Sequence, residues 1–212
     1  MIYSEVVLMK QYHKTQIDAL VAKNIESDKK ILALEEKVNN LEQQLLANCI
    51  EIYNVPNNNN TLTNVDIALK VLCDGLNVNI NKADIDQCYM KKITTKPSSN
   101  ANATNKNVKS TNINILRVKL VSQLMKEKIM KTKRERRDQL TTNLFDAKRK
   151  SENIFVNDCL TYETRQLLNK ALSLKTEMGF KYVWTKNGRV YMRRSEGDKP
   201  VRIFCAADFD KI

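Results

Sequence analysis

A heptad repeat between positions 17 and 45 constrains the fold of this chain more than any other feature. Its positions alternate three and four residues apart, the period that keeps one stripe of an α-helix against a partner helix. β-Branched residues occupy most a positions and leucines most d positions, which favours two parallel helices. The predicted oligomerisation residues are Ile17, Leu20, Asn24, Ile31, Leu34, Val38, Leu41 and Leu45.

Charged residues beside this seam indicate how the helices are oriented. In a parallel pair, each g residue faces the e residue five positions later on the partner chain. The three such pairs are Lys23 with Asp28, Lys30 with Glu35 and Lys37 with Glu42. An antiparallel pair would bring like charges together instead. We therefore predict that residues 1–48 form a parallel coiled coil; the alternative is one amphipathic helix packed on its own domain, which usually has a broader apolar face.

Residues 49–133 are predicted to form a small α/β domain. The expected elements are a strand over 49–56, a helix capped by Asn64 that ends near Gly75, a short helix over 81–90 capped by Asn81, a strand over 113–120, and a helix from Ser122 to about Met130. Residues 94–112 contain almost no large apolar side chains, so they are expected to form a mobile loop. We expect helices on one face of a sheet, as in RNA-recognition modules.

The strands of this domain lack the aromatic residues with which RNA-recognition modules stack bases. Glu51 stands where such a residue is expected, and the segment 113–120 contains no aromatic residue. Base stacking on this sheet is therefore not predicted.

Positive charge is concentrated in the second half of the chain, which has a formal net charge of +12. Residues 1–116 carry 13 basic and 12 acidic side chains, whereas residues 117–212 carry 23 basic and 12 acidic ones. This asymmetry favours a polyanionic partner for the second half. The segment 126–137 is densest in cations and is predicted to form a phosphate-contacting bridge just after the preceding helix.

The C-terminal segment 134–212 is predicted to form a bridge followed by a small α+β domain. A strand over 153–157 and a helix from Thr161 to Gly179 precede a hairpin centred on Asn187-Gly188, a sequence that favours a type I′ turn. In that register Tyr182, Trp184 and Tyr191 share one face with cations, as the stacking of unpaired bases requires. The alternative is that Trp184 and Tyr191 pack on the preceding helix as core residues.

These patterns define the predicted nucleic-acid-binding set, which combines the basic bridge with one face of the hairpin. It comprises Lys126, Lys128, Lys131, Lys133, Arg134, Arg136, Arg137, Trp184, Lys186, Arg189, Tyr191, Arg193 and Arg194.

Other sequence features exclude several classes of function. The five cysteines form no C-x-x-C pair, so we expect them to be reduced intracellular thiols. Because His13 is the single histidine, we expect no metal site, and we expect no cofactor. Apolar runs are too short to span a bilayer, and we expect neither secretion nor membrane insertion. The pairs Asp84/Asp86 and Asp208/Asp210 offer an alternative divalent-ion site, but each lacks supporting ligands. We expect no enzymatic activity.

Several segments together resemble a known viral family. They are IEIYNVP, DIDQCYMKK, INILRVKLVSQLMKEKIM, FVNDCLTYETRQLLNKA and KYVWTKNGRVYMRR. They resemble the baculovirus few-polyhedra proteins, whose relatives include the first-open-reading-frame proteins of LINE-type retrotransposons. The resemblance implies a coiled coil, an RNA-recognition-like domain and a C-terminal domain, with single-stranded nucleic acid held in the basic cleft between the last two. The resemblance to the retrotransposon relatives implies a trimer, whereas these a and d residues favour a dimer.

The predicted function follows from the charge pattern and the resemblance. We expect a self-associating accessory protein of an insect virus that binds single-stranded RNA or DNA and affects occlusion-body formation and the balance between occluded and budded virus. Its expected partners are further copies of itself, nucleic acid and viral structural proteins, and its expected locations are the host cytoplasm, the nucleus and the virion. The alternatives are a coiled-coil scaffold that recruits viral or cellular proteins and a retrotransposon-derived nucleic-acid chaperone.

Overall fold

The computed structural model of the chain describes residues 2–56, 62–95, 111–136, 139–146 and 151–211. The chain divides into two units, Met1–Gln44 and Leu45–Ile212, and each is considered by itself. Residues 96–110 of the predicted mobile loop lie outside the described residues, whereas its ends at 94–95 and 111–112 belong to strands. No helix in the described part of the chain is both long and apolar enough to cross a membrane.

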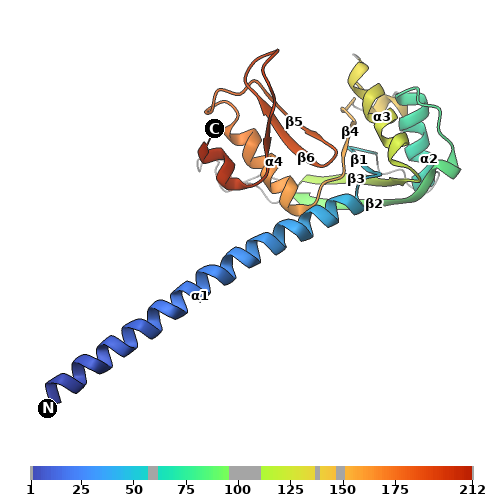
Figure 1. Cartoon of the computed structure of the whole chain (residues 1–212). Coiled ribbons are helices and arrows are strands. Elements are labelled where there is room, and N and C mark those ends of the chain that lie inside the picture. The colour runs from blue at the N-terminus through green and yellow to red at the C-terminus, as the bar shows by residue number, and fades with distance from the viewer. Residues whose placement is uncertain (1, 57–61, 96–110, 137–138, 147–150, 212) are drawn as a thin grey trace, which may run out of the picture. The chain divides into compact units, whose positions relative to one another are not determined.

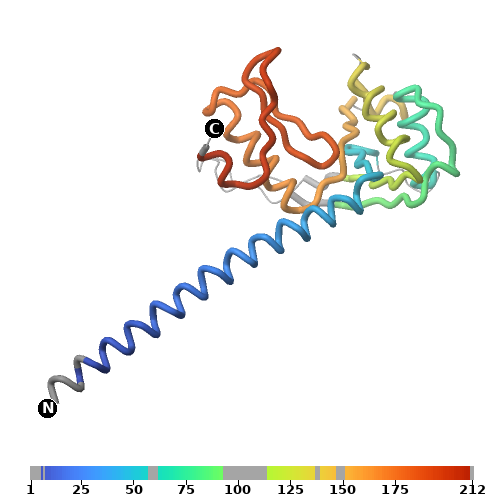
Figure 2. Tube along the Cα trace, in the orientation of Figure 1, coloured from blue at the N-terminus to red at the C-terminus, as the bar shows by residue number. Residues whose placement is uncertain are grey.

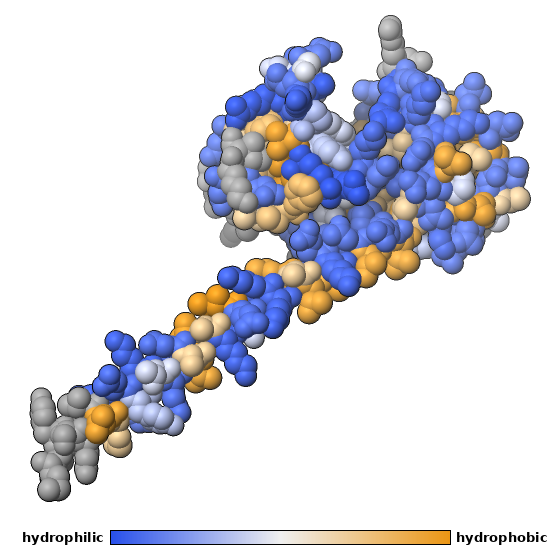
Figure 3. All heavy atoms as spheres, in the orientation of Figure 1, coloured by the Kyte–Doolittle hydropathy of each residue, from blue (hydrophilic) through white to orange (hydrophobic). Residues whose placement is uncertain are grey.

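The N-terminal unit is occupied by one uninterrupted helix, α1 (Ile2–Leu45), seen as the long blue coil in Figures 1 and 2. The predicted seam residues are exposed along it; Leu34 and Leu45, for example, are 61% and 76% exposed. Figure 3 shows apolar side chains gathered along a helix that is otherwise hydrophilic. Such a row of exposed apolar residues is compatible with the predicted coiled coil, although the pairing itself stays a prediction.

The second unit contains a four-stranded antiparallel sheet with the strand order β2-β3-β1-β4. Its strands are β1 (Cys49–Tyr53), β2 (Ile85–Thr95), β3 (Thr111–Leu120) and β4 (Phe155–Asp158). Two helical segments connect them: α2 (Asn64–Leu69) continues into the wide turn η1 (Lys70–Gly75), and α3 (Gln123–Glu135) precedes β4. The order along the chain is therefore β-α-β-β-α-β (Figure 1).

The core of this unit lies between the sheet and its two helical segments. Ile50 and Ile52 of β1 point into it, because alternate residues of a strand face opposite sides of the sheet. They meet Val71 and Leu72 of η1 and Ile129 of α3, all of which are fully buried. Glu51, between the two isoleucines, points to the other side of the sheet.

One predicted helix start is displaced by a residue, and another caps a shorter element than expected. The cap of α2 is Thr63 rather than Asn64, because the Thr63 hydroxyl accepts from the Asp66 backbone N–H while the Asp66 carboxylate accepts from the Thr63 backbone N–H. Asn81 does act as a cap, but only of the short 3₁₀ turn η2 (Lys82–Asp84).

The predicted helix over 81–90 is wrong, because Ile85 begins the long strand β2. A register shift interrupts the pairing of β2 with β3 between Ile85 and Gln87. In such a bulge two residues of one strand lie opposite a single residue of its partner. As a result Ile85 and Cys88, three apart in sequence, both pack against the core. That spacing resembles one face of a helix.

The helix from Ser122 is confirmed but longer than expected. Ser122 caps α3, which continues to Glu135, so most of the predicted basic bridge lies within the helix rather than after it. Strand β4, which belongs to the predicted segment 134–212, pairs instead with β1 in the first sheet. Its observed bounds are Phe155–Asp158, two residues later at the start than expected.

The remaining residues form a second, smaller sheet against the helix α4 (Tyr162–Leu174), which Thr161 caps as predicted and which ends before the expected Gly179. The hairpin of β5 (Tyr182–Lys186) and β6 (Arg189–Arg193) has the predicted register, with Trp184 opposite Tyr191. Asn187 and Gly188 both have positive φ, as a type I′ turn requires. A third strand, β7 (Val201–Ile203), and the 3₁₀ helix η4 (Ala206–Lys211) were not predicted.

Candidate nucleic-acid interface

The outer face of the β5–β6 hairpin carries a cluster of aromatic rings and cations. Val190 and Met192 point to the opposite face, where they are buried in the small C-terminal core. Trp184 and Tyr191 are half-buried and stack on each other across the strands, with ring centroids 5.7 Å apart and planes inclined by 17°. The two rings therefore lie on the face turned away from the core.

The guanidinium group of Arg193 lies over two aromatic rings of the hairpin. The Arg193 guanidinium is 4.8 Å from the centroid of Tyr182 and 5.9 Å from that of Trp184. Each contact has the geometry of a cation–π interaction, which holds a cation beside a ring without neutralising it. Lys186 and Arg189, on either side of the turn, are exposed. The hairpin therefore presents positive charge next to flat aromatic surfaces.

Strand β7 extends the same face with residues that the sequence analysis missed. Arg202 lies opposite Tyr191, and its guanidinium is 3.9 Å from the ring centroid of Phe204, which is 56% exposed. Arg194, one of the predicted residues, lies over the ring of Phe180 at 5.3 Å. The turn residues Ser195, Gly197, Asp198 and Pro200 were an available signal that a further strand follows β6, although the pairing of β7 with β6 depends on the fold of the whole C-terminal sheet.

Helix α3 and its C-terminal cap present a second group of cations. Among the described residues, Lys131, Arg134 and Arg136 are exposed near the end of the helix. Lys131 lies 3.8 Å from Glu135, and the Nε of Arg134 donates to the backbone carbonyl of Met130. Arg136 is exposed at the C-terminal cap of the helix. Lys128 is also exposed, and Arg137 lies outside the described residues. Cations at the end of a helix also interact favourably with its dipole.

Two predicted phosphate-contacting lysines of α3 have other partners. Lys126 is 2% exposed, and its Nζ lies 3.0 Å from Asp158 of β4 in a buried ion pair. The Lys133 Nζ donates to the Asn157 side chain at 3.2 Å, and burial lowers the pKa of Lys133. Lys126 is thus not available to a phosphate. Lys126 precedes the inward-facing Ile129 by three residues and Lys133 by seven. This spacing places all three on one face of the helix and could have indicated that Lys126 points inward.

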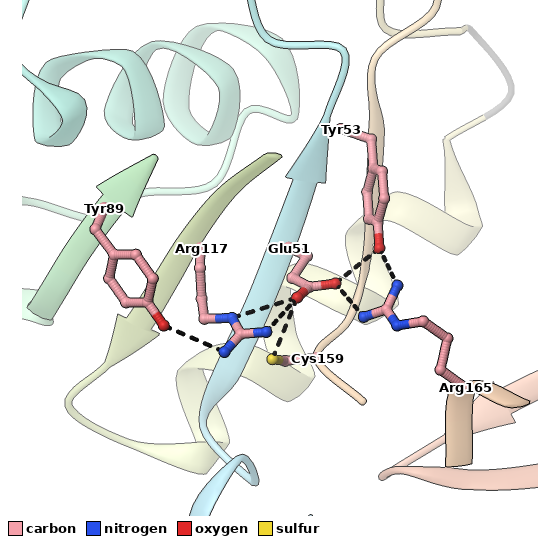
Figure 4. Close-up of polar contacts among 6 residues, drawn as sticks. All are labelled: Glu51, Tyr53, Tyr89, Arg117, Cys159 and Arg165. Atoms are coloured by element: carbon pink, nitrogen blue, oxygen red, sulfur yellow. Dashed lines mark hydrogen bonds and ion pairs between the residues drawn. The ribbon is translucent and has the colours of Figure 1, made fainter. Parts of the chain in front are cut away.

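A buried carboxylate organises the face of the first sheet that is turned away from its core (Figure 4). Glu51 is 2% exposed, and its Oε1 accepts from Arg117 Nη2 of β3 at 2.7 Å. Its Oε2 accepts from Arg165 Nη2 of α4 at 2.7 Å and from the Tyr53 hydroxyl at 2.8 Å. Arg165 also donates to the Tyr53 hydroxyl. One carboxylate therefore joins two strands of the sheet to the helix of the C-terminal segment.

Further polar groups complete this network. Arg117 Nη1 donates to the Tyr89 hydroxyl of β2 at 3.2 Å, and Cys159 Sγ donates to Glu51 Oε1 at 3.6 Å. Burial raises the pKa of the Cys159 thiol to about 12, so the thiol keeps its proton at neutral pH. Burial also raises the pKa of Glu51, but the hydrogen bonds from Arg165, Arg117 and Tyr53 outweigh it and leave that pKa below its ordinary value. Glu51 is therefore an anion in the folded protein.

The residue that replaces a stacking aromatic on β1 thus has a positive structural role. Its two arginine partners lie 66 and 114 residues further along the chain, so sequence reading alone found no reason for an acidic residue in a buried strand. A charge inside an otherwise apolar strand was the available signal, since buried charges are generally paired.

The aspartate pairs considered as ion sites are engaged elsewhere. Asp84 accepts from the Asn81 backbone N–H, and Asp86 pairs with Lys119. Asp208 accepts from the backbone N–H groups of Phe204 and Cys205 at the start of η4. Within the described ranges, no group of three or more His, Cys, Asp or Glu side chains is placed to hold a metal ion. All five cysteines are free thiols.

Comparison with known proteins identifies the C-terminal segment. Residues 161–212 match the family model described as Baculovirus FP protein domain 2. The matched range begins at the cap of α4 and contains Arg165 and the whole β5–β7 sheet. None of the curated proteins matches the chain. The relation to LINE-type retrotransposon proteins stays a prediction. The match, which covers about the last quarter of the chain, supports membership of the baculovirus FP family.

Proposed function

We propose that this few-polyhedra-type protein is a self-associating, non-enzymatic accessory protein that binds single-stranded nucleic acid through its C-terminal half. The observation that carries the proposal is the outer face of the β5–β6 hairpin, where Trp184 and Tyr191 lie beside Arg193 and the exposed Lys186 and Arg189. Unpaired bases stack on aromatic rings while cations contact the phosphates, and a duplex does not offer its bases in this way.

The exposed cations of α3 support the proposal as a second phosphate-contacting surface. Lys128, Lys131, Arg134 and Arg136 are exposed, and the second half of the chain holds nearly all of the excess positive charge. Such contacts give affinity without base preference.

The element order of the first sheet supports an RNA-recognition-like domain. The β-α-β-β-α-β order with central strands β3 and β1 is the split βαβ arrangement. In this protein the middle of the sheet face carries the Glu51 network, which Arg165 ties to helix α4, so the domain serves mainly as a scaffold for the cationic surfaces.

Self-association is proposed to occur through α1. A helix whose apolar seam is exposed over its whole length gains little from propensity alone, and burying the seam against a second copy removes that surface from water. The parallel orientation rests on the three complementary charge pairs between g and e positions. A dimer is favoured by the residues at a and d.

The biological role is proposed from the family. Self-association and binding of single-stranded RNA or DNA would suit an accessory protein in occlusion-body formation, acting with viral structural proteins in the host cytoplasm, the nucleus or the virion.

Fluorescence anisotropy with matched single- and double-stranded oligonucleotides tests the proposed function. If about five phosphates are neutralised, log K should fall against log salt with a slope of roughly −3.5, since each single-strand contact contributes about −0.7. Replacing Arg134, Arg136 and Arg137 together by Ala should flatten the slope by up to about two units and weaken all sequences alike.

A variant of the exposed Lys91 and Lys92 of β2, both replaced by Ala, is the matched control for non-specific loss of charge. It should keep the parent's slope, because these lysines lie outside the proposed surfaces. If the arginine variant binds with the parent's affinity and slope, the cations form only a solvated face. The coiled-coil scaffold then becomes the better account of this protein.

A further inference from the structure

A small pocket lies between the C-terminal end of α3, strand β4 and residues 139–140. Its volume is about 160 Å³, and its floor is formed by buried apolar side chains that include Leu140 and Val156. The cations Lys133 and Arg136 line it together with Phe155, an aromatic residue of the edge strand that is 47% exposed. An apolar floor, an exposed ring and two cations therefore meet in one place.

The chemistry of this lining selects for a ligand with both a flat apolar part and a negative charge. Lys133 is held by its hydrogen bond to Asn157, so its ammonium group is already positioned in the lining. Its partial burial disfavours the charged form, and an anion bound next to it would offset that cost. Pockets for drug-sized ligands span about 300–1,000 Å³, so this one can enclose a single ring, while the charged part of such a ligand would lie at its mouth.

Helix stability explains only part of this arrangement. Cations in the last turn of α3 offset the helix dipole, which accounts for the positions of Lys133 and Arg136. It says nothing of Phe155, which strand alternation turns to the side opposite its buried neighbours Ile154 and Val156, so that its ring is exposed at the edge of the sheet. Arginine and lysine beside an exposed ring are what a nucleotide requires, since the base has an apolar face and the phosphate a charge.

We propose that this pocket holds one nucleotide of a bound single strand, with the base against Phe155 and the apolar floor and the phosphate between Lys133 and Arg136. The inference rests on the proposed nucleic-acid binding and adds to it a defined single-nucleotide subsite. The pocket would fix one position of the strand, whereas the hairpin face and the exposed cations of α3 contact it less selectively.

The subsite is tested by titrating the full-length protein with uridine 5′-monophosphate, uridine and inorganic phosphate, followed by NMR chemical shifts or calorimetry. The monophosphate should bind more tightly than either of its parts, because only it reaches the floor and both cations. Replacing Lys133 and Arg136 together by Ala should lower the affinity for the monophosphate by about tenfold or more, since two charge-assisted contacts are lost. The Lys91/Lys92 double-Ala variant removes the same charge elsewhere and should bind like the parent.

A further variant tests the role of the Phe155 ring. Phe155→Leu keeps an apolar side chain on β4. It should lower the affinity for the monophosphate without changing the affinity for inorganic phosphate. Circular dichroism and thermal melting verify that each variant is folded. Equal binding of the monophosphate and inorganic phosphate, or monophosphate binding unaltered by the Lys133/Arg136 variant, would overturn the subsite.

The outcomes for the subsite and for the proposed function are distinguishable. If oligonucleotides bind to the parent and the pocket variants bind the monophosphate as the parent does, the subsite is wrong and the proposed function stands. If the monophosphate binds as predicted but oligonucleotides do not bind, the pocket is a site for a free mononucleotide, and both the proposed function and the placing of the pocket on a bound strand are wrong.

Discussion

Glu51 and Arg165 are 114 residues apart in sequence, yet the Arg165 guanidinium lies 2.7 Å from the buried Glu51 carboxylate. The contact joins the central strand β1 to helix α4, the first element of the segment that matches the family model. Arg117 holds the other carboxylate oxygen at the same distance. One buried charge therefore links the C-terminal helix to the sheet.

Replacing Glu51 by Gln should destabilise the protein strongly, because two arginines would lose their shared anion. Breaking a buried ion pair by removing one partner costs about 3–5 kcal/mol. We expect a loss of that order in the free energy of unfolding, measured by urea denaturation. Asp86→Asn is the control, since its pair with Lys119 is exposed and should contribute little to stability. Equal effects of the two substitutions would contradict the assigned role of Glu51.

The same carboxylate should make stability depend on pH. The pKa of Glu51 lies below its ordinary value of 4.5 in the folded protein, so the unfolded chain binds the proton more readily. Its contribution is therefore fully present above pH 4.5 and is lost as the pH falls through the lower folded pKa. Asp66, whose pKa is about 2, acts in the same direction. The difference in unfolding free energy between the parent and Glu51→Gln should shrink between pH 6 and pH 3, and a constant difference would exclude this linkage.

Substitution in the α1 seam should dissociate the oligomer. Leu34 lies at d, where a charged residue would be buried against the partner helix, so Leu34→Asp should shift the protein to monomer in sedimentation experiments. Leu32→Asp introduces the same charge at an outward b position and should leave the oligomer intact. Both leucines are exposed in the single chain, at 61% and 65%, so exposure alone would not distinguish them. A monomeric parent protein would sink the prediction.

Asn24 should limit the number of helices at a cost in stability. A buried amide at an a position specifies register and oligomeric state but is less stabilising than an apolar residue. Asn24→Ile should therefore raise the melting temperature of α1 and broaden the distribution of oligomers seen by sedimentation. An unchanged melting temperature would argue against the assigned heptad register.

Trp184→Phe should weaken the binding of single strands with little loss of stability. The Trp184 ring lies outside the C-terminal core and stacks on Tyr191, so a smaller ring loses contact area with a base rather than packing. Met192→Ala on the opposite face is the contrasting variant: Met192 is fully buried, and its truncation should cost about 2–5 kcal/mol. Thermal melting and anisotropy on both variants check this. A large drop in melting temperature for Trp184→Phe would instead place the ring in the core.

Much of the local structure could be predicted from the sequence. Ser122 and Thr161 cap their helices as expected, and Asn187-Gly188 sets the full register of the β5–β6 hairpin. Both signals act over a few residues: a side chain bonds a nearby backbone N–H, and a turn admits positive φ. They therefore do not depend on the rest of the chain.

The misassigned elements are those where tertiary contacts determine the structure. The bulge near Asp86 gave β2 a spacing that resembles a helix, and only its pairing with β3 shows it to be a strand. Lys126 belongs to a dense run of cations, yet it is buried because Asp158 of β4 lies opposite it. Neither outcome follows from the neighbouring residues.

By itself the sequence determined the long amphipathic helix, the caps at Ser122 and Thr161, the hairpin and the asymmetry of charge, because each depends on intrinsic backbone preferences or on composition. The tertiary structure alone decided that β4 joins the first sheet, that Glu51 collects Arg117 and Arg165, and that Lys133, Arg136 and Phe155 line one pocket. These relationships join residues far apart in the chain. They form only when burial of the two cores repays the entropy of closing the long loops between them.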